Sequence, residues 1–133
     1  MFAHLTLPTQ HVEDTTRFLE QTLGYARKRV PPNSPVDVRW LDIGKGQELH
    51  VFFVEEFVVS PNEAEFGRHV ALFHPLADFP AMRQRIVEAG GEIVDALRAT
   101  PFERIFFREP INGYLFEVIV DARHRQILAE PGL

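Results

Sequence analysis

Three histidines and one glutamate stand at matching places in two similar halves of the chain. His4 and His69 lie near the start of the two halves, and His50 and Glu117 lie near the end of each. Glu117 is surrounded by apolar neighbours in residues 115–119, where an ionised carboxylate is costly unless a cation or a metal ion meets it. Imidazole and carboxylate ligands together suit zinc, iron, nickel or manganese. The pattern therefore predicts a divalent metal site with open positions for a substrate.

Some of these residues have competing interpretations. A single histidine in a strand is more often a surface or hydrogen-bonded residue than a ligand. Glu48 lies two residues from His50, so alternation places both on one face and makes Glu48 an alternative ligand. The histidines outside the repeat, His11, His74 and His124, are expected on the surface or in loops.

Candidate substrate contacts come from arginine and phenylalanine. Arg104 and Arg108 flank Phe106 in an alternating run, so the three share one face. Arginines in such a strand are usually solvated, but directed inward they would hold an anionic substrate through forked hydrogen bonds. We expect Phe52 and Phe106 to contact the substrate, whereas Trp40 and most other aromatic residues are expected in the core.

The elements that carry the first set of candidates follow from hydrophobic periodicity. Residues 2–8 alternate as a strand, and an acidic start at residues 13–16 leads into an apolar helical stripe that Gly24 ends. Three further runs read as strands: 25–30, 36–43 and 48–54. The first repeat, about 2–54, is thus strand, helix and three strands, followed by a linker at 55–67.

The second half repeats this order over about 68–120. Residues 69–74 read as a strand, Asp78 is a candidate N-cap for a helix over 79–89, and residues 92–96 read as a strand. Residues 104–120 read as a hairpin, because an Asn-Gly pair between two apolar runs favours a tight reversal. Residues 121–133 are polar and predict a surface helix or a frayed tail.

Composition narrows the class of protein. A chain of 133 residues is about one domain long. Its net charge is −5 with both signs scattered, which argues against nucleic acid or an anionic membrane as partner. Cysteine is absent, which excludes a disulfide framework and suits a reducing cytoplasm, where we expect the protein. No apolar run approaches the ~20 residues of a membrane-spanning helix, and the N-terminus has no signal-peptide pattern.

Taken in order, these motifs resemble the vicinal oxygen chelate superfamily, which includes glyoxalase I, extradiol dioxygenases and bleomycin-resistance proteins. The matching segments are His4-Leu-Thr-Leu7, Leu23-Gly24-Tyr25, Leu49-His-Val-Phe52, Gly67-Arg-His-Val-Ala-Leu72, Glu88-Ala-Gly-Gly-Glu92 and residues 106–118. The resemblance implies an α+β, glyoxalase-like fold in which two βαβββ units form an incomplete curved barrel, here as a single domain over 1–133.

The resemblance also implies a function. Ligands in the superfamily come from the first and last strands of each unit, which implies His4, His50, His69 and Glu117 as ligands of one divalent ion. It implies isomerase, lyase or dioxygenase chemistry on a small substrate with neighbouring oxygens, with Glu117 also acting as catalytic base, in a homodimer. The alternative is a metal-free protein that binds a small molecule, as bleomycin-resistance proteins do.

Three features depart from the superfamily pattern, and one of them is Leu19, which stands in the first helix where members often have tyrosine. His50 stands where glyoxalase-like members often have glutamate, which speaks against glyoxalase I itself. The hairpin turn, Glu109-Pro-Ile-Asn-Gly113, has one residue more than the usual Asp-Pro-x-Gly.

Overall fold

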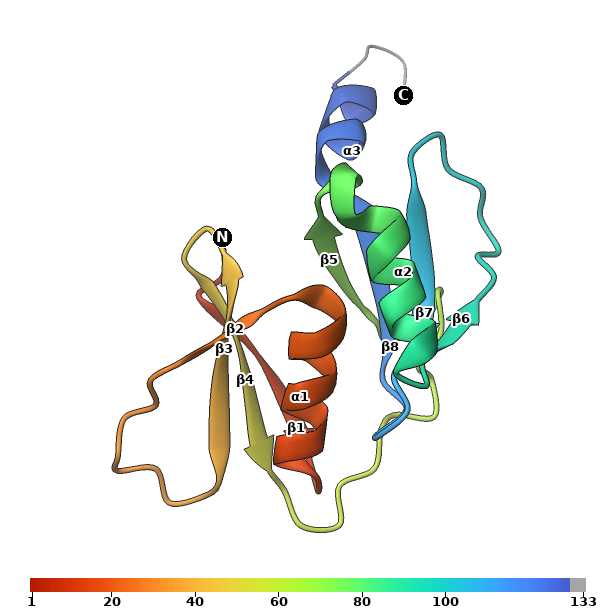
Figure 1. Ribbon diagram of the computed structural model, residues 1–133. Helices are drawn as coiled ribbons and strands as arrows, with labels where there is room; N and C mark the ends of the chain where they lie inside the picture. The colour runs from red at the N-terminus through yellow and green to blue at the C-terminus, as the bar shows by residue number, and fades with distance from the viewer. Residues whose placement is uncertain (130–133) are drawn as a thin grey trace. The chain divides into compact units, whose positions relative to one another are not determined.

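The computed structural model describes residues 1–129. They divide into two compact units, the first over Met1–Val58 and the second from Val59 onward. Each unit contains a four-stranded open sheet with a helix against one face (Figure 1). The chain order in each is strand, helix and three strands, so the predicted α+β fold of two βαβββ units is confirmed. The prediction that the two repeats and their linker form a single domain stays a prediction.

The first unit has the sheet order β1-β4-β3-β2. Parallel pairing joins β1 to β4, and the other neighbours are antiparallel. Its elements are β1 (His4–Thr9), α1 (Val12–Leu23), β2 (Ala26–Lys28), β3 (Val38–Gly44) and β4 (Gln47–Phe53). The predicted strand at 25–30 is shorter than expected, because pairing with β3 stops at Lys28 and the proline-rich loop follows. Gly24 adopts the left-handed conformation that ends α1, as predicted.

The second unit has the equivalent sheet order β5-β8-β7-β6, again with one parallel pair. Its elements are β5 (Val70–His74), the short 3-10 helix η1 (Leu76–Asp78), α2 (Phe79–Glu88), β6 (Glu92–Val94), β7 (Arg104–Arg108), β8 (Leu115–Val120) and α3 (Asp121–Leu128). The predicted strand at 92–96 ends at Val94, where pairing with β7 ends. The polar tail is helical through α3, and residues 130–133 of that prediction lie outside the described residues.

Strand alternation divides each sheet into an apolar face and a face that carries the candidate site residues. In the first unit, the fully buried Leu7, Leu41, Leu49 and Val51 share the face that packs with α1. His4 and the other candidate residues of this sheet alternate with these buried residues along the strands. Their side chains therefore lie on the face away from the helix. In the second unit, the face that is opposite to the Glu117 side chain is formed by buried apolar residues. They are Leu72, Phe107, Phe116 and Val118. The candidate residues are thus directed away from the helical layer in both units.

The hairpin turn between β7 and β8 is organised by the carboxylate of Glu109, which is 1% exposed. Its oxygens accept hydrogen bonds from the backbone N–H groups of Ile111 (2.8 Å), Asn112 (2.8 Å) and Tyr114 (3.1 Å). Gly113 has a φ of 91°, which favours glycine. The long glutamate side chain thus spans a turn that is one residue longer than the usual one.

The helix α2 begins at Phe79 as predicted, but Asp78 does not cap it with its side chain. Instead, the carboxylate of Asp78 bonds to Arg85 (2.6 Å) and to His74 (2.7 Å). These bonds, that to Arg85 first and that to His74 second, hold the pKa of Asp78 well below its usual range. Asp78 therefore ties β5 to α2.

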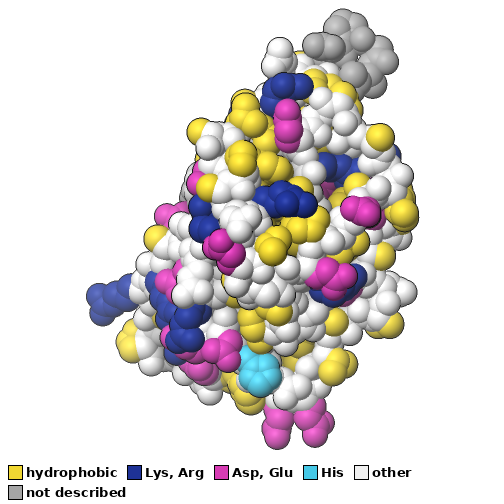
Figure 2. Space-filling model, turned by 45° about the vertical axis from the view of Figure 1, so that its right-hand side comes forward, with side chains coloured by type: hydrophobic (Ala, Val, Ile, Leu, Met, Phe, Trp, Pro, Cys, Tyr) yellow, Lys and Arg dark blue, Asp and Glu magenta, His cyan; other side chains and the backbone are white. Residues whose placement is uncertain are grey.

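Acidic and basic side chains are mixed on the molecular surface. On the face drawn in Figure 2, they lie next to one another with apolar side chains between them, and neither sign forms a broad patch. Some of these side chains form exposed ion pairs, such as Arg17 with Asp14. Within residues 1–129, every helix is too short or too polar to cross a membrane. The expected cytoplasmic location stays a prediction.

Candidate functional site

The candidate residues of the first unit form a row of stacked rings across three strands. The ring of His50 on β4 lies 4.0 Å from that of His4 on β1 and 4.3 Å from that of Trp40 on β3, measured between centroids. The planes are nearly parallel, at 11° and 2°. The two histidines predicted as ligands are therefore neighbours on the face away from α1.

A carboxylate fixes the orientation of His50. Its Nε2 lies 2.9 Å from Oε1 of Glu48, whose second oxygen pairs with Lys28. Because the carboxylate can only accept, Nε2 of His50 carries the proton and Nδ1 is left as the electron donor of the neutral ring. Metal-binding histidines are commonly held in this way. Glu48, considered as an alternative ligand, has both oxygens engaged.

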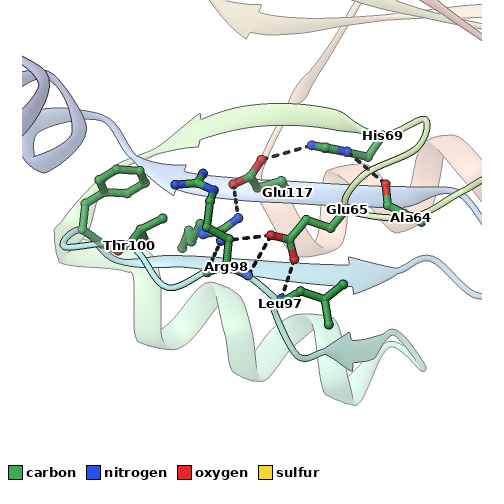
Figure 3. A network of polar contacts seen from close by, with 9 residues as sticks. Ala64, Glu65, His69, Leu97, Arg98, Thr100 and Glu117 are labelled. Carbon is green, nitrogen blue, oxygen red and sulfur yellow. Dashed lines mark hydrogen bonds and ion pairs between the residues drawn. The ribbon is translucent and has the colours of Figure 1, made fainter. Parts of the chain in front are cut away.

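The candidate residues of the second unit also meet. His69 directly precedes β5, and its Nε2 lies 3.2 Å from Oε1 of Glu117 on β8. Its Nδ1 lies 3.2 Å from the carbonyl oxygen of Ala64, which can only accept a hydrogen bond. Nδ1 therefore carries a proton, and the neutral ring presents the lone pair of Nε2 to a carboxylate (Figure 3). Two facing electron donors need a cation between them or a second proton on the ring.

The buried carboxylate of Glu117 has a cation partner in its own unit. Nη1 of Arg104 lies 2.9 Å from Oε2 of Glu117, and the Arg104 side chain is only 4% exposed. The other end of the guanidinium contacts the carbonyl oxygen of Arg98 and lies 3.4 Å from Glu65. The predicted need for a positive partner is thus met on one oxygen of Glu117, and the other oxygen faces His69.

Glu65 completes this buried network, although its sequence context placed it in a linker without a role. Its two oxygens accept the backbone N–H groups of Leu97 (2.6 Å) and Arg98 (3.1 Å), as Figure 3 shows. Burial by itself raises the pKa of Glu65, but these donors and the Arg104 guanidinium outweigh it and lower the pKa below its usual value. Glu65 thereby holds the loop before β7 and Arg104 in one place.

Both units place their pair of candidates in the same strand register. Thr6 is the β1 partner of His50, and His4 stands two residues before it. Ala71 is the β5 partner of Glu117, and His69 stands two residues before it. The repeat seen in the sequence is therefore also a repeat of geometry.

The structure brings the four predicted ligands together as two pairs, His4 with His50 and His69 with Glu117. Among residues 1–129, no group of three or more His, Asp or Glu side chains is arranged to hold a metal ion. Each unit therefore contributes two candidates, and their convergence on one ion stays a prediction.

The predicted substrate contacts are in different environments. Phe52 is partly exposed on the same sheet face as His50, whereas Phe106 is 1% exposed and packs edge-on against His69, with ring centroids 5.2 Å apart. Arg108 bonds to the carbonyl oxygens of Gly113 (3.0 Å) and Glu63 (3.3 Å). An anionic substrate would have to displace these contacts or those of Arg104, and the role of both arginines in substrate binding stays a prediction.

The first unit also contains a pocket beside His50, of about 300 Å³. Trp40 was expected in the core, but it lines this pocket. The loop over residues 29–37 forms the other side of the pocket. The alternation of β3 places Trp40 on the same face as Val38, which was the available signal for this position.

The other three histidines lie outside these pairs. His11 is exposed before α1, as expected. His74 is 6% exposed and bonds to Asp78, so the expectation of a surface position was wrong, because the last residue of β5 faces α2. His124 on α3 is half-buried beside Phe73 and Phe102.

Two βαβββ units, each with paired histidine or carboxylate side chains on the face away from its helix, define a protein of the glyoxalase-like fold class. Over residues 1–118 the sequence matches the family model described as the Glyoxalase/Bleomycin resistance protein/Dioxygenase superfamily. The chain belongs to this superfamily. No curated protein sequence matches it significantly.

Solved structures with the same fold share little sequence. The fosfomycin resistance protein FosX from Mesorhizobium loti is 18% identical, with a TM-score of 0.71 over 96% of this chain and 97% of that one. A FosX variant from Listeria monocytogenes, complexed with Mn(II) and 1S,2S-dihydroxypropylphosphonic acid, is 16% identical with a TM-score of 0.73 over 96% and 97%. A hypothetical protein from S. aureus is 20% identical with a TM-score of 0.65 over 90% and 96%. At these identities the likeness is one of fold.

Proposed function

We propose that the protein is a metal-dependent enzyme of the vicinal oxygen chelate type. It acts on a small substrate with two neighbouring oxygens, by isomerase, lyase or dioxygenase chemistry, and uses one divalent ion such as Zn, Fe, Ni or Mn. Membership of the superfamily supports this proposal, and so do the Mn(II) complexes of FosX, a protein of the same fold.

The contact between His69 and Glu117 is the observation on which the proposal rests. The ring of His69 is held by the Ala64 carbonyl with Nε2 directed at a carboxylate oxygen 3.2 Å away. Ligand bonds of about 2.0–2.2 Å place two ligand atoms of one ion about 3 Å apart. The pair thus has the spacing of ligands, and its backbone partner is one that metal-binding histidines often have.

The residues of the chain then take distinct roles. His4, His50, His69 and Glu117 would hold the ion, which supplies a Lewis acid for the oxygens of the substrate. Glu117 is also the carboxylate that accepts a proton from the substrate, since it is the one acidic candidate in the set. Arg104 holds the second oxygen of Glu117 and fixes the direction of the first.

The second candidate function is a metal-free protein that binds a small molecule. Arg104 favours it, because its guanidinium already supplies a positive charge to Glu117 at 2.9 Å. In that case the ring of His69 carries a second proton and donates it to Glu117.

Metal titration of the purified, metal-free protein separates the two functions. We expect Mn(II) or Zn(II) to bind with a stoichiometry near one per chain in isothermal titration calorimetry. His69→Ala and Glu117→Gln should each weaken that affinity by at least tenfold, as should His4→Ala. His11→Ala is the matched control, because His11 is an exposed histidine outside both pairs. Absence of binding in the wild-type protein favours the metal-free function.

We also propose that the chain forms a homodimer, as is common in the superfamily. Two units that each offer two candidate ligands are compatible with sites built within one chain or shared between two. Sedimentation equilibrium at several concentrations measures the mass directly, and a monomer at all of them contradicts the proposal.

A further inference from the structure

From the pocket of the first unit we infer that the ligand of this protein has an uncharged, planar ring as its body. This inference rests on the proposed function in one respect: the two neighbouring oxygens of the substrate are placed toward His50. The pocket is contained within residues 6–52, so its lining comes from one compact unit.

The size of the pocket suits a substituted ring. Its volume is about 300 Å³. A dry cavity of roughly 150 Å³ holds benzene, so this pocket has room for one ring with substituents or for two small rings. Pockets for small ligands begin at about this volume.

Apolar and aromatic groups form most of the lining. Six apolar side chains from the sheet and the loop over residues 29–37 contribute: Val30, Pro31, Val36, Val38, Trp40 and Phe52. Within this wall the rings of Trp40 and His50 are stacked on each other. Flat ring systems gain offset-stacked and edge contacts with such side chains.

The polar part of the lining is small. It consists of Thr6, Asn33, Ser34 and His50, and none of the described lining residues is Lys, Arg, Asp or Glu. Glu48, which bonds to His50, has its negative charge balanced by the ion pair with Lys28. Away from His50, where the proposed function places the metal ion, an anionic group in this pocket would lose its hydration without meeting a cation, which is strongly unfavourable.

A structural relative of the same fold was solved with a phosphonic acid, which is an anion. Arg104 and Arg108, the arginines predicted to contact an anion, are in the second unit, where their guanidinium groups bind backbone carbonyls and a carboxylate. The geometry therefore favours neutral ligands for this pocket over phosphonates or carboxylates.

Trp40 is the sole tryptophan of the chain, so its indole N–H signal in a nitrogen–proton correlation spectrum reports on the pocket. Metal-free protein is titrated with three probes of similar size: benzyl alcohol, benzoate and cyclohexylmethanol. We expect a saturable shift of the Trp40 signal with benzyl alcohol, with benzoate and cyclohexylmethanol each binding at least tenfold more weakly. Equal or tighter binding of either comparison probe, or no saturable shift with any probe, overturns the inference.

A second test introduces a positive charge at the edge of the pocket, at an exposed position where the packing changes little. Val36 is 45% exposed at the pocket, and Val36→Arg should shift the preference toward benzoate by at least tenfold. Val58→Arg is the matched control, since Val58 is 80% exposed and is not among the lining residues. An unchanged preference in Val36→Arg counts against the inference. Because these titrations contain no metal, their failure is distinguishable from a failure of metal binding.

Discussion

Nη1 of Arg104 lies 2.9 Å from Oε2 of Glu117, and the two side chains are only 4% and 9% exposed. The pair joins adjacent strands of the second sheet, β7 and β8. A buried carboxylate that keeps its charge needs such a partner, and loss of one member leaves the other unpaired in an apolar environment. Arg104 therefore supplies the positive charge that faces the buried carboxylate of Glu117.

Replacing Arg104 by methionine should lower the free energy of unfolding by about 3–5 kcal/mol, the usual cost of breaking a buried ion pair. Both Glu117 and Glu65 lose a partner in this variant. Urea denaturation followed by circular dichroism measures the change. The Arg17→Met control removes an exposed pair and should change stability by less than about 1 kcal/mol. A similar small loss in Arg104→Met would show that the buried pair contributes little.

A bound metal ion should raise the thermal stability of the protein. A ligand that binds only the folded state at a free concentration of 100 times Kd stabilises it by about 2.7 kcal/mol. We expect Mn(II) to raise the Tm of the wild-type protein and chelation by EDTA to reverse the rise. His69→Ala should show a much smaller rise, whereas His11→Ala should behave as wild type. Equal shifts in His69→Ala and wild type would place the ion elsewhere.

Much of this architecture could be predicted from the sequence because it depends on local periodicity. Alternation placed His50 and Glu48 on one face, and the pattern of buried leucines shows that this face points away from α1. The apolar neighbours of Glu117 correctly predicted a positive partner. The identity of that partner depends on the register of β7 against β8, which pairs Phe106 with Glu117 and brings Arg104 alongside.

Other contacts had no local signal. Glu65 belongs to an irregular segment, yet it holds the N–H groups of Leu97 and Arg98, more than thirty residues later in the chain. Trp40 is a typical core residue by type, and its place in a pocket depends on the path of the loop over residues 29–37. Such long-range placements are set by tertiary packing and leave no periodic pattern.

Shortening the side chain at position 109 tests the organisation of the hairpin turn. The Glu109 carboxylate accepts three backbone N–H groups, and hydrogen bonds to charged groups contribute about 1.5–3 kcal/mol each at most. Glu109→Asp cannot span the longer turn and should lose about 2 kcal/mol of stability in urea denaturation. Glu109→Gln retains the length and one acceptor and should lose less. Stability in Glu109→Asp equal to that of the wild type would mean that the turn does not need the carboxylate.

The pair of Asp78 with Arg85 and His74 should make stability depend on pH in the acidic range. Hydrogen bonds from Arg85 first and His74 second depress the pKa of Asp78 in the folded protein. Its contribution is therefore fully present above the ordinary aspartate pKa of about 3.9 and declines as the pH falls toward the lower folded value.

Asp78→Asn removes this charge at the start of α2. Because the Asp78 side chain is 43% exposed, solvent screening limits the loss at pH 7 to about 1 kcal/mol. We expect the difference in unfolding free energy between wild type and Asp78→Asn to shrink progressively as the pH falls below about 4. Urea denaturation at each pH measures it, with Asp14→Asn as the matched control for an exposed aspartate. A difference that grows as the pH falls below about 4 would mean that the Asp78 pair is not the source of the effect.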